Sequence, residues 1–226
     1  MEKLFVENKI ELTKEQENKF STLYELLINY NKMFNLTAIT EKEQVYIKHF
    51  IDSILGAKYY KGKNVLDVGS GGGFPAIPVK IMRDDIHFTL MEATGKKCEF
   101  LNKVIEELGL KNIRVVCGRA EELAKTKEFR EQFDTVSARA LARLNTLSEY
   151  LLPFVKKGGI MLSYKGDATD EVIEAQSAVK ILGGGDMEVF EYELYGAKRA
   201  LISVKKLENT PLKYPRQNSK IKKNPL

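Results

Sequence analysis

Residues 64–73 read Asn-Val-Leu-Asp-Val-Gly-Ser-Gly-Gly-Gly, a short apolar run that ends in a glycine-rich turn. The apolar residues are of the kind that a parallel sheet buries on both faces, so the run predicts a buried strand. Glycine occupies every second position from residue 69 to residue 73, which lets the backbone adopt positive φ and approach a ligand closely. With the carboxylate of Asp67 just before the turn, the stretch predicts the entrance to a nucleotide-type cofactor site.

Two cofactor classes use a turn of this kind, and the glycine spacing distinguishes them. The dinucleotide pattern Gly-x-Gly-x-x-Gly, counted from Gly69, requires a glycine at position 74, where this chain has Phe74. The acidic-x-Gly-x-Gly-x-Gly loop of S-adenosylmethionine (SAM) methyltransferases matches Asp67 through Gly73. The sequence therefore favours a SAM site over a nicotinamide site. A glycine-rich turn without a ligand is the remaining alternative.

The chain has 226 residues, enough for one domain with an appendage and a well-packed core. It contains no apolar stretch of about 18 residues and no signal peptide, so we expect a cytoplasmic protein without a membrane contact. We also expect a monomer that holds no metal. Cys98 and Cys117 have no Cys or His partner at ligand spacing, so we interpret them as buried free thiols.

The positive charge of the chain is concentrated near its end. Between residues 207 and 226 five basic residues oppose one acidic residue, so this segment carries +4 of the net charge of +5. Three of the six prolines lie there too, which predicts neither a helix nor a central strand. The segment is either a solvated tail or an arm that meets a polyanion. Beside a SAM site the arm is favoured, because lysine and arginine near phosphates gain affinity through counterion release.

The hydrophobic pattern divides the chain into three parts. Residues 1–60 predict a helical extension, with Thr13 as a helix cap and Thr40 with Glu43 as a capping box. Residues 61–207 alternate strands and helices, the pattern of a parallel sheet with crossover helices, and residues 208–226 are the basic tail. We expect strands at 64–68, 86–92, 113–117, 133–137 and 159–164, and helices at 75–83, 95–108, 119–130, 140–151 and 168–182.

The end of the core departs from this alternation. Two strand-like segments, beginning at Met187 and at Leu201, are separated by a turn too short for a crossover, so the two strands must be antiparallel. The predicted fold is therefore α/β, a Rossmann-like class I SAM-dependent methyltransferase. It would have a mostly parallel sheet that ends in an antiparallel hairpin, with an N-terminal helical extension.

Several side chains follow the predicted strands at the edge where open α/β sheets bind ligands. Glu92 ends the second strand and can accept both ribose hydroxyls, although it also fits the N-terminus of the next helix. The stretch Cys117-Gly-Arg-Ala-Glu121 can flank an adenine, and an ordinary loop fits it equally well. Arg139 follows the fourth strand and points at the crevice unless it is a surface arginine.

Other polar residues are expected close to the same crevice. Lys165 ends the fifth strand, while Lys96 and Lys97 begin the helix after Glu92. Each lysine can meet a substrate phosphate or remain solvated. His49 is the one histidine expected near the crevice, and we interpret its role as structural rather than as orienting a substrate.

Absent motifs narrow the chemistry further. The chain has no Asn/Asp-Pro-Pro-Tyr/Phe run for methylating an exocyclic amine, and neither cysteine lies in the context of a nucleophile for carbon-5 methylation. The remaining targets are already nucleophilic and need positioning more than deprotonation. Guanine N7 is such a target, since it is an unprotonated acceptor at the major-groove edge.

The motifs of the chain together resemble those of one family. They are Asn35-Leu-Thr37, His49-Phe-Ile-Asp-Ser53, the run from Asp67 to Pro78, Gly95-Lys-Lys97, Arg119-Ala-Glu121, Ser137-Ala-Arg-Ala140, Tyr164-Lys-Gly166 and Tyr214-Pro-Arg216 with Asn224-Pro-Leu226. The chain resembles the bacterial glucose-inhibited division protein B family, the 16S ribosomal RNA (guanine-N7) methyltransferases. The resemblance runs from about residue 20 to the end, and it implies SAM as cofactor and 16S rRNA or the small ribosomal subunit as partner.

The resemblance also implies roles for individual residues. Those expected to bind SAM are Gly69, Gly71, Phe74, Glu92, Ala93, Thr94, Ala120, Glu121 and Arg139. Those expected in the transfer chemistry are Arg139, Arg119 and Lys96. We expect RNA contacts from Lys96, Lys165, Arg199, Arg216, Lys220 and Lys222.

The chain departs from the family pattern where many members have Leu-Asp-Ser and it has Met91-Glu92-Ala93. Many members also have Gly-Ile-Pro where this chain has Ala76-Ile-Pro78. Glu92 can still accept from the ribose hydroxyls as an aspartate would, but its side chain is one carbon longer, so the geometry of the contact differs. Two other functions remain as rivals on the sequence: an RNA-binding assembly factor without turnover, and a dinucleotide-dependent oxidoreductase.

Overall fold

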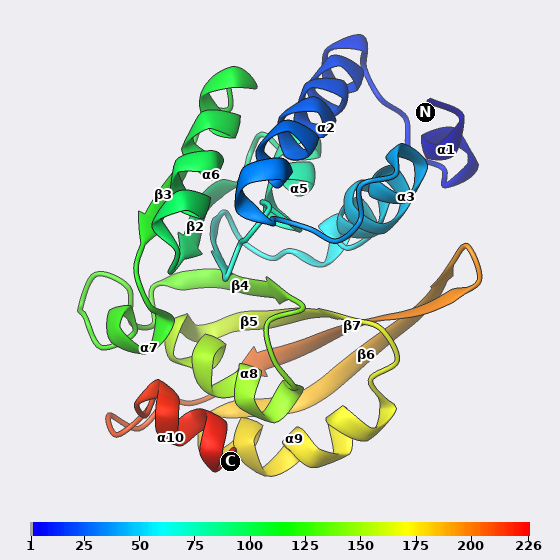
Figure 1. Ribbon diagram of the computed structural model, residues 1–226. Helices are drawn as coiled ribbons and strands as arrows, with labels where there is room; N and C mark the ends of the chain where they lie inside the picture. The colour runs from blue at the N-terminus through cyan, green and yellow to red at the C-terminus, as the bar shows by residue number, and fades with distance from the viewer. Residues whose placement is uncertain (1) are drawn as a thin grey trace.

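The computed structural model describes residues 2–226 and has one sheet with helices on both faces (Figure 1). Within these residues the strands run in the order β3-β2-β1-β4-β5-β7-β6. The first five are parallel, whereas β7 is antiparallel to both β5 and β6. The expected parallel sheet with an antiparallel end is therefore confirmed. The strand bounds are β1 Asn64–Val68, β2 His87–Glu92, β3 Ile113–Cys117, β4 Phe133–Arg139, β5 Val155–Lys165, β6 Gly184–Leu194 and β7 Ala197–Lys206.

The helices form two layers, one on each face of the sheet. The first layer contains α1 Glu2–Glu7, α2 Lys14–Phe34, α3 Lys42–Val45, α4 Asp52–Leu55, α5 Ala76–Met82 and α6 Gly95–Glu107. The second contains α7 Ala120–Leu123, α8 Leu144–Leu151, α9 Thr169–Ile181 and α10 Asn218–Lys223. A π-helical turn at Tyr46–Ile51 joins α3 to α4, and 3₁₀ turns cover Ala57–Tyr59 and Leu152–Phe154. None of the helices in residues 2–226 is long and apolar enough to span a bilayer.

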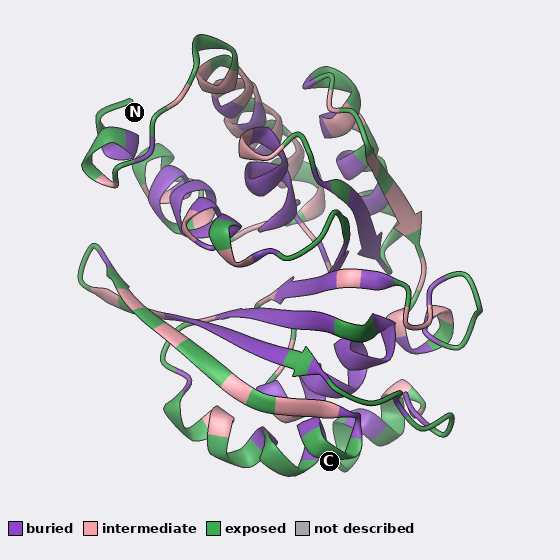
Figure 2. Ribbon diagram, turned by 180° about the vertical axis from the view of Figure 1, so that it is seen from behind, coloured by how far each residue is buried: buried purple, intermediate pink, exposed green. Residues whose placement is uncertain are grey.

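Each layer packs its own hydrophobic core against the sheet, as the buried inner surfaces in Figure 2 show. Successive residues of a strand point to opposite faces, so Val65 belongs to the first core and Leu66 to the second. This division explains why the residues before the glycine turn read as a continuous apolar run. The strand β1 has the bounds expected from the sequence and pairs in parallel with β2 and β4.

The helices before β1 share the first core with the sheet. Thr13 caps α2 through the expected side-chain contact, with Gln16 completing the capping box. The expected capping box of Thr40 and Glu43 is wrong: Glu41 caps α3, and its carboxylate accepts the backbone N–H groups of Glu43 and Gln44. A charged carboxylate is a stronger acceptor for these N–H groups than a hydroxyl, which explains the shift by one residue.

Two helices are shorter than the sequence suggests. The helix expected at 119–130 is limited to α7, because the Thr126 hydroxyl donates to the carbonyl of Leu123 and closes the turn. Helix α8 starts at Leu144 rather than at residue 140, since Ala140 has a φ of 55° that a right-handed helix excludes. The loop between β4 and α8 is left free to border a cleft.

The basic tail differs most from expectation. It forms α10 and packs on α8, so the expectation that the segment builds no helix is wrong. Arg216 donates to the fully buried carboxylate of Glu149 with distances down to 2.6 Å, while Ile221 is fully buried in the second core. The pair of Arg216 with the buried Glu149 holds the tail against the protein. The proline-rich composition gives no indication of this contact.

The expectation of two free thiols is also wrong, because Cys98 and Cys117 form a disulfide with a Cα–Cα distance of 6.0 Å. Cys98 lies in the first turn of α6 and Cys117 ends β3. Since β2 and β3 are adjacent and parallel, the chain after β2 returns beside the end of β3 and brings the two side chains together. A linear spacing rule does not detect this approach.

Candidate active site

Two clefts of about 400 Å³ each open at the carboxyl ends of the parallel strands. We name them the Glu92 cleft and the His49 cleft. The Glu92 cleft is lined, among others, by Glu92, Ala93, Lys97, Arg119, Ala120, Glu121, Tyr150, Asn218 and Lys222. The His49 cleft is lined, among others, by Thr37, Lys48, His49, Asp52, Phe74, Lys165 and Arg199. The two clefts share Gly69, Gly71, Arg139 and Ala140, so they meet at the glycine turn and the end of β4.

The glycine turn is held in place by the residue that ends β2. The backbone N–H of Gly71 donates to Oε2 of Glu92 at 3.0 Å, and the N–H of Thr94 donates to Oε1 at 2.9 Å. Gly69 donates to the carbonyl of Met91 at 2.8 Å. Glu92 is buried beneath these contacts, and each carboxylate oxygen retains a second lone pair for a ligand. The Glu92 carboxylate thus both shapes the turn and borders the cleft.

Backbone conformation explains why the turn is glycine-rich. Gly69 and Gly71 have φ values of 70° and 53°. A Cβ at position 69 would lie 2.8 Å from Cδ1 of Leu141, whereas a Cβ at position 71 meets no atom closer than 3.8 Å. Position 71 therefore requires glycine for its φ and leaves its side toward the cleft open.

Beneath the turn, Asp67 has an oxygen without a partner. The Ser137 hydroxyl donates to Oδ1 at 2.8 Å, while Oδ2 is buried and accepts no hydrogen bond among the described residues. Complete burial raises the pKa of the Asp67 carboxyl to about 6. A buried, unpartnered carboxylate oxygen beside a glycine turn suits a cationic ligand, and the ammonium and sulfonium groups of SAM are cations.

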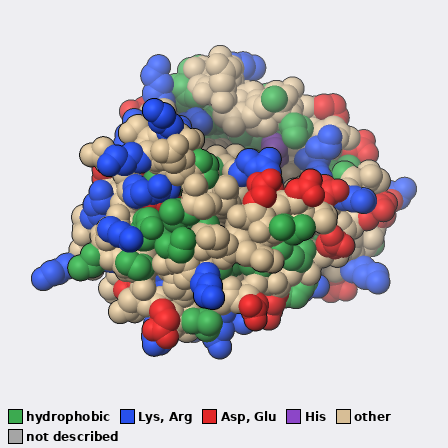
Figure 3. Space-filling view, turned by 90° about the horizontal axis from the view of Figure 1, so that it is seen from below, with side chains coloured by type: hydrophobic (Ala, Val, Ile, Leu, Met, Phe, Trp, Pro, Cys, Tyr) green, Lys and Arg blue, Asp and Glu red, His purple; other side chains and the backbone are tan. Residues whose placement is uncertain are grey.

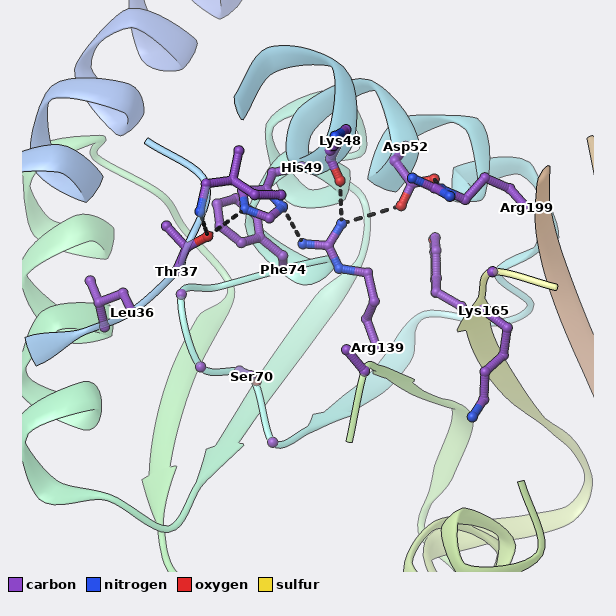
Figure 4. A pocket seen from close by; sticks show the side chains of 17 residues that line it. Leu36, Thr37, Lys48, His49, Asp52, Ser70, Phe74, Arg139, Lys165 and Arg199 are labelled. Atoms are coloured by element: carbon purple, nitrogen blue, oxygen red, sulfur yellow. Dashed lines mark hydrogen bonds and ion pairs between the residues drawn. The ribbon is translucent and has the colours of Figure 1, made fainter. Parts of the chain in front are cut away.

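The imidazole of His49 lies at the centre of the hydrogen bonds in the His49 cleft (Figure 4). His49 stacks on Phe74 with ring centroids 4.6 Å apart, and Nδ1 accepts from the Arg139 guanidinium at 3.0 Å. Because arginine only donates, the proton is assigned to Nε2, which lies 2.8 Å from Oγ1 of Thr37. Burial and the nearby Arg139 lower the pKa of His49 to about 3. The imidazole of His49 is therefore uncharged near pH 7.

Arg139 is itself fixed by groups that precede β1. One guanidinium nitrogen donates to the carbonyl of Lys48 at 3.0 Å and to Oδ2 of Asp52 at 3.3 Å, as the dashed lines in Figure 4 mark. The other oxygen of Asp52 accepts from the Tyr192 hydroxyl at 2.9 Å and pairs with Arg199 at 3.3 Å. The buried carboxylate of Asp52 thus joins the end of β4 to the hairpin of β6 and β7.

Comparison with known proteins agrees with this arrangement. A family model described as GidB, rRNA small subunit methyltransferase G, matches residues 16–218. The chain belongs to this family. Proteins called ribosomal RNA small subunit methyltransferase G are 46% identical in Lachnoclostridium phytofermentans and 43% identical in Lactobacillus acidophilus. These alignments cover 96% of this chain, and 92% and 93% of the two relatives. The resemblance stated from the motifs is confirmed.

Solved structures show the same fold at low sequence identity. Cofactor-bound Rv0187 from MTB has a TM-score of 0.58 at 16% identity, covering 83% of this chain and 91% of that chain. A SAM dependent methyltransferase from Aquifex aeolicus has a TM-score of 0.52 at 16% identity, covering 79% and 97%. The predicted class I methyltransferase fold is confirmed. Membership of the methyltransferase family agrees with the SAM cofactor expected from the glycine turn.

The structure of this GidB family member brings most of the expected cofactor residues together. Gly69, Gly71, Glu92, Ala93, Ala120, Glu121 and Arg139 line the Glu92 cleft. Phe74 lines the His49 cleft instead, and Thr94 reaches the site through its N–H bond to Glu92. Of the residues expected in transfer chemistry, Arg119 and Arg139 line a cleft, whereas Lys96 lies with its ammonium 6.0 Å from the centre of the Phe34 ring.

The basic residues expected to contact RNA occupy different surroundings. Arg199 lines the His49 cleft, and Lys220 is exposed on α10. Lys165 also lines the His49 cleft, but its ammonium donates to the carbonyl of Ala142 and to Glu171. Arg216 pairs with Glu149. Lys and Arg side chains dominate the side of Figure 3 on which α10 lies, and Asp and Glu gather on the other side.

Sequence reasoning missed the role of Asp52 and Tyr192 in holding Arg139. The motif that contains His49 and Asp52 was recognised, and a spacing of three residues on a helical segment places both side chains on one face. That spacing was the available signal for Asp52. Tyr192 reaches the site across a separation of 140 residues, and the sequence carries no signal for this contact.

Proposed function

We propose that this protein transfers the methyl group of SAM to N7 of a guanosine in 16S rRNA of the small ribosomal subunit. The observation that carries the proposal is the meeting of two clefts at Gly69, Gly71, Arg139 and Ala140. A donor in the Glu92 cleft and a base in the His49 cleft would face each other across this boundary. We further propose that the enzyme acts in the cytoplasm as a monomer and without a metal ion.

The residues that line the Glu92 cleft support SAM as its occupant. SAM supplies a methyl group on a positively charged sulfur, which becomes a neutral thioether after transfer. Gly71 opens the approach to the turn, and the free oxygen of Asp67 lies buried beneath it. Glu92 would accept from the ribose, while Ala120 and Glu121 border the part of the cleft assigned to the adenine.

The His49 cleft supports a target that needs no deprotonation. His49 accepts from Arg139 and donates toward Thr37, and Asp52 lies between two arginines, so both groups are already engaged. Neither is placed as a free general base. Guanine N7 has a lone pair available for attack on the methyl carbon, so orientation by Arg139 and its neighbours would suffice.

The proposal also assigns RNA contacts to basic groups around the clefts. Arg199 and Lys48 line the His49 cleft, and Lys220 is exposed on α10. Phosphates that meet such groups release counterions, so binding to RNA would weaken as salt rises. Lys165 and Arg216 would contribute less, because both are engaged with carboxylates.

Methyl transfer from labelled SAM tests the proposal directly. Small subunits and naked 16S rRNA from cells that lack the modification are incubated with the enzyme, and mass spectrometry locates the methylated nucleotide. We expect one methyl group on guanine N7. Binding of SAM without incorporation into either substrate would favour a non-catalytic assembly factor, and methylation at another atom would overturn the assignment of N7. Binding of NADH in place of SAM would contradict the cofactor.

A further inference from the structure

The C-terminal helix α10 lies against the Glu92 cleft. Asn218 and Lys222 are one helical turn apart and both line the cleft, while Ile221 beside them is fully buried in the second core. Lys222 is exposed although it lines the cleft, and Lys220 and Lys223, which are also exposed, lie on other faces of the helix. The helix therefore has one polar pair that borders the cleft and a separate pair of lysines that does not.

Three sets of contacts fix this helix in position. The Tyr150 hydroxyl of α8 donates to Oδ1 of Asn218 at 2.6 Å, and Tyr150 lines the same cleft. Just before the helix, Arg216 is bound to the buried Glu149. Arg130 donates to the backbone carbonyls of Thr210 and Tyr214 at 2.6 and 3.0 Å. The tail is thus bound to the second layer before it reaches the cleft, which Asn218 and Lys222 line.

The polar groups at this end of the cleft complement an adenine. Glu121 is a buried acceptor that borders the cleft, as does Tyr150. Asn218 and Lys222, which line the same cleft, carry donor groups. Adenine presents an exocyclic amine that donates and ring nitrogens that accept, so it matches a site with one acceptor and such donors.

The Lys222 ammonium is available for a ligand. Arg216 and Lys206 are paired with carboxylates, but none of the ion pairs between described residues includes Lys222. A cation that lines a cleft without a protein partner can donate a charge-assisted hydrogen bond, which is stronger than a neutral one.

We propose that α10 forms part of the cofactor site, with the Lys222 ammonium donating to the adenine of bound SAM and Asn218 positioned beside it by Tyr150. This inference rests on the proposed methyltransferase function. It assigns cofactor binding to a segment whose basic composition suggests RNA binding alone. Lys222 is a binding residue in this assignment, whereas Tyr150 is a positioning residue that acts through Asn218.

Calorimetry with S-adenosylhomocysteine, the product form of the cofactor, tests the inference without turnover. We expect Lys222→Met to bind this probe about tenfold more weakly, as the loss of a charged hydrogen bond of about 1.4 kcal/mol implies. Lys223→Met removes the same charge from another face of the same helix and is the matched control, for which we expect unchanged affinity. Tyr150→Phe, which releases Asn218, is expected to weaken binding several-fold.

A chain that ends at Gln217 provides a second measurement. It lacks α10 and should lose more affinity than Lys222→Met, provided that circular dichroism shows it folded. The inference is overturned if Lys222→Met, or the folded truncated chain, binds the probe as tightly as the full chain. Failure of the full chain itself to bind the probe would instead contradict the proposed methyltransferase function.

Discussion

Arg139 donates a hydrogen bond to Nδ1 of His49 across 3.0 Å, and this contact connects the end of β4 to the helices before β1. The guanidinium also donates to the carbonyl of Lys48 and pairs with Asp52, so three groups determine its direction. Because Arg139 borders both clefts, its orientation sets the geometry at which a cofactor and a base would meet. His49, whose pKa is lowered, therefore orients Arg139 through a hydrogen bond and does not need to exchange a proton.

Replacing Arg139 by Lys should lower methyl transfer to small subunits by about 100-fold. Lysine keeps the charge but lacks the planar fork that reaches His49, Asp52 and the Lys48 carbonyl together, and misplacement by about 1 Å can have an effect of this size. Single-turnover rates with saturating SAM measure it. Arg143→Lys is the control, because Arg143 pairs with Glu174 at the surface. A full rate in Arg139→Lys would show that the fork is dispensable.

Replacing Gly71 by Val should abolish SAM binding. The φ of 53° disfavours any branched side chain, and the added methyl groups would enter the approach to the turn. Gly109→Val is a matched control, since Gly109 has a φ of 57° with no atom near its missing Cβ and lies outside both clefts. Both variants should lose stability by a similar amount, but only Gly71→Val should lose affinity in calorimetry. Retained affinity would place the cofactor elsewhere.

Asp67 should make the protein less stable as pH rises from about 4 to 6. Below this window the folded and unfolded states both hold the proton. Within it the unfolded chain releases the proton near its ordinary pKa of 3.8, while the folded chain keeps it up to about 6. The unfolded state is favoured by this difference, which amounts to about 3 kcal/mol above the window.

Asp67→Asn should remove this contribution. Urea unfolding of the free protein at pH 4, 5, 6 and 7 compares the two chains, and the variant should gain stability relative to the native chain as pH rises. Asp84→Asn, a change at an exposed residue, controls for the loss of a carboxylate. A parallel pH dependence for Asp67→Asn and the native chain would contradict the raised pKa.

Replacing Arg216 by Ala should destabilise the protein by about 3 kcal/mol, because it leaves the carboxylate of Glu149 buried without its cation. The exposed Lys213→Ala should have little effect on urea unfolding. The double variant with Glu149→Gln removes the unpaired charge and should recover part of the loss. Equal stability of Arg216→Ala and Lys213→Ala would show that the ion pair with Glu149 contributes nothing to the fold.

Local patterns predicted the parts of the molecule whose structure depends on neighbours in the chain. The run before Gly69 identified β1 because burial on both faces leaves a continuous apolar signal. The same turn identified the cofactor class, and Glu92 and Arg139 followed from their places at strand ends. The start of β5 was missed by four residues, because Lys156-Lys-Gly-Gly159 reads as a turn although it continues a strand.

Contacts between distant segments could not be predicted in this way. Arg216 lies 67 residues from Glu149, so composition described the tail as solvated or as an RNA arm. Asp52 and Tyr192 meet across 140 residues, and Asn218 meets Tyr150 across 68. Each of these pairs depends on how the whole sheet is assembled. Neither the charge pattern nor the hydrophobic periodicity of the sequence indicates such a contact.

The ion pair of Asp52 with Arg199 joins a residue that precedes β1 to a residue of β7 at the His49 cleft. Strand β7, which carries Arg199, follows all of the parallel strands in the sequence. The wall that Arg199 forms is therefore complete only after β7 has paired with β5.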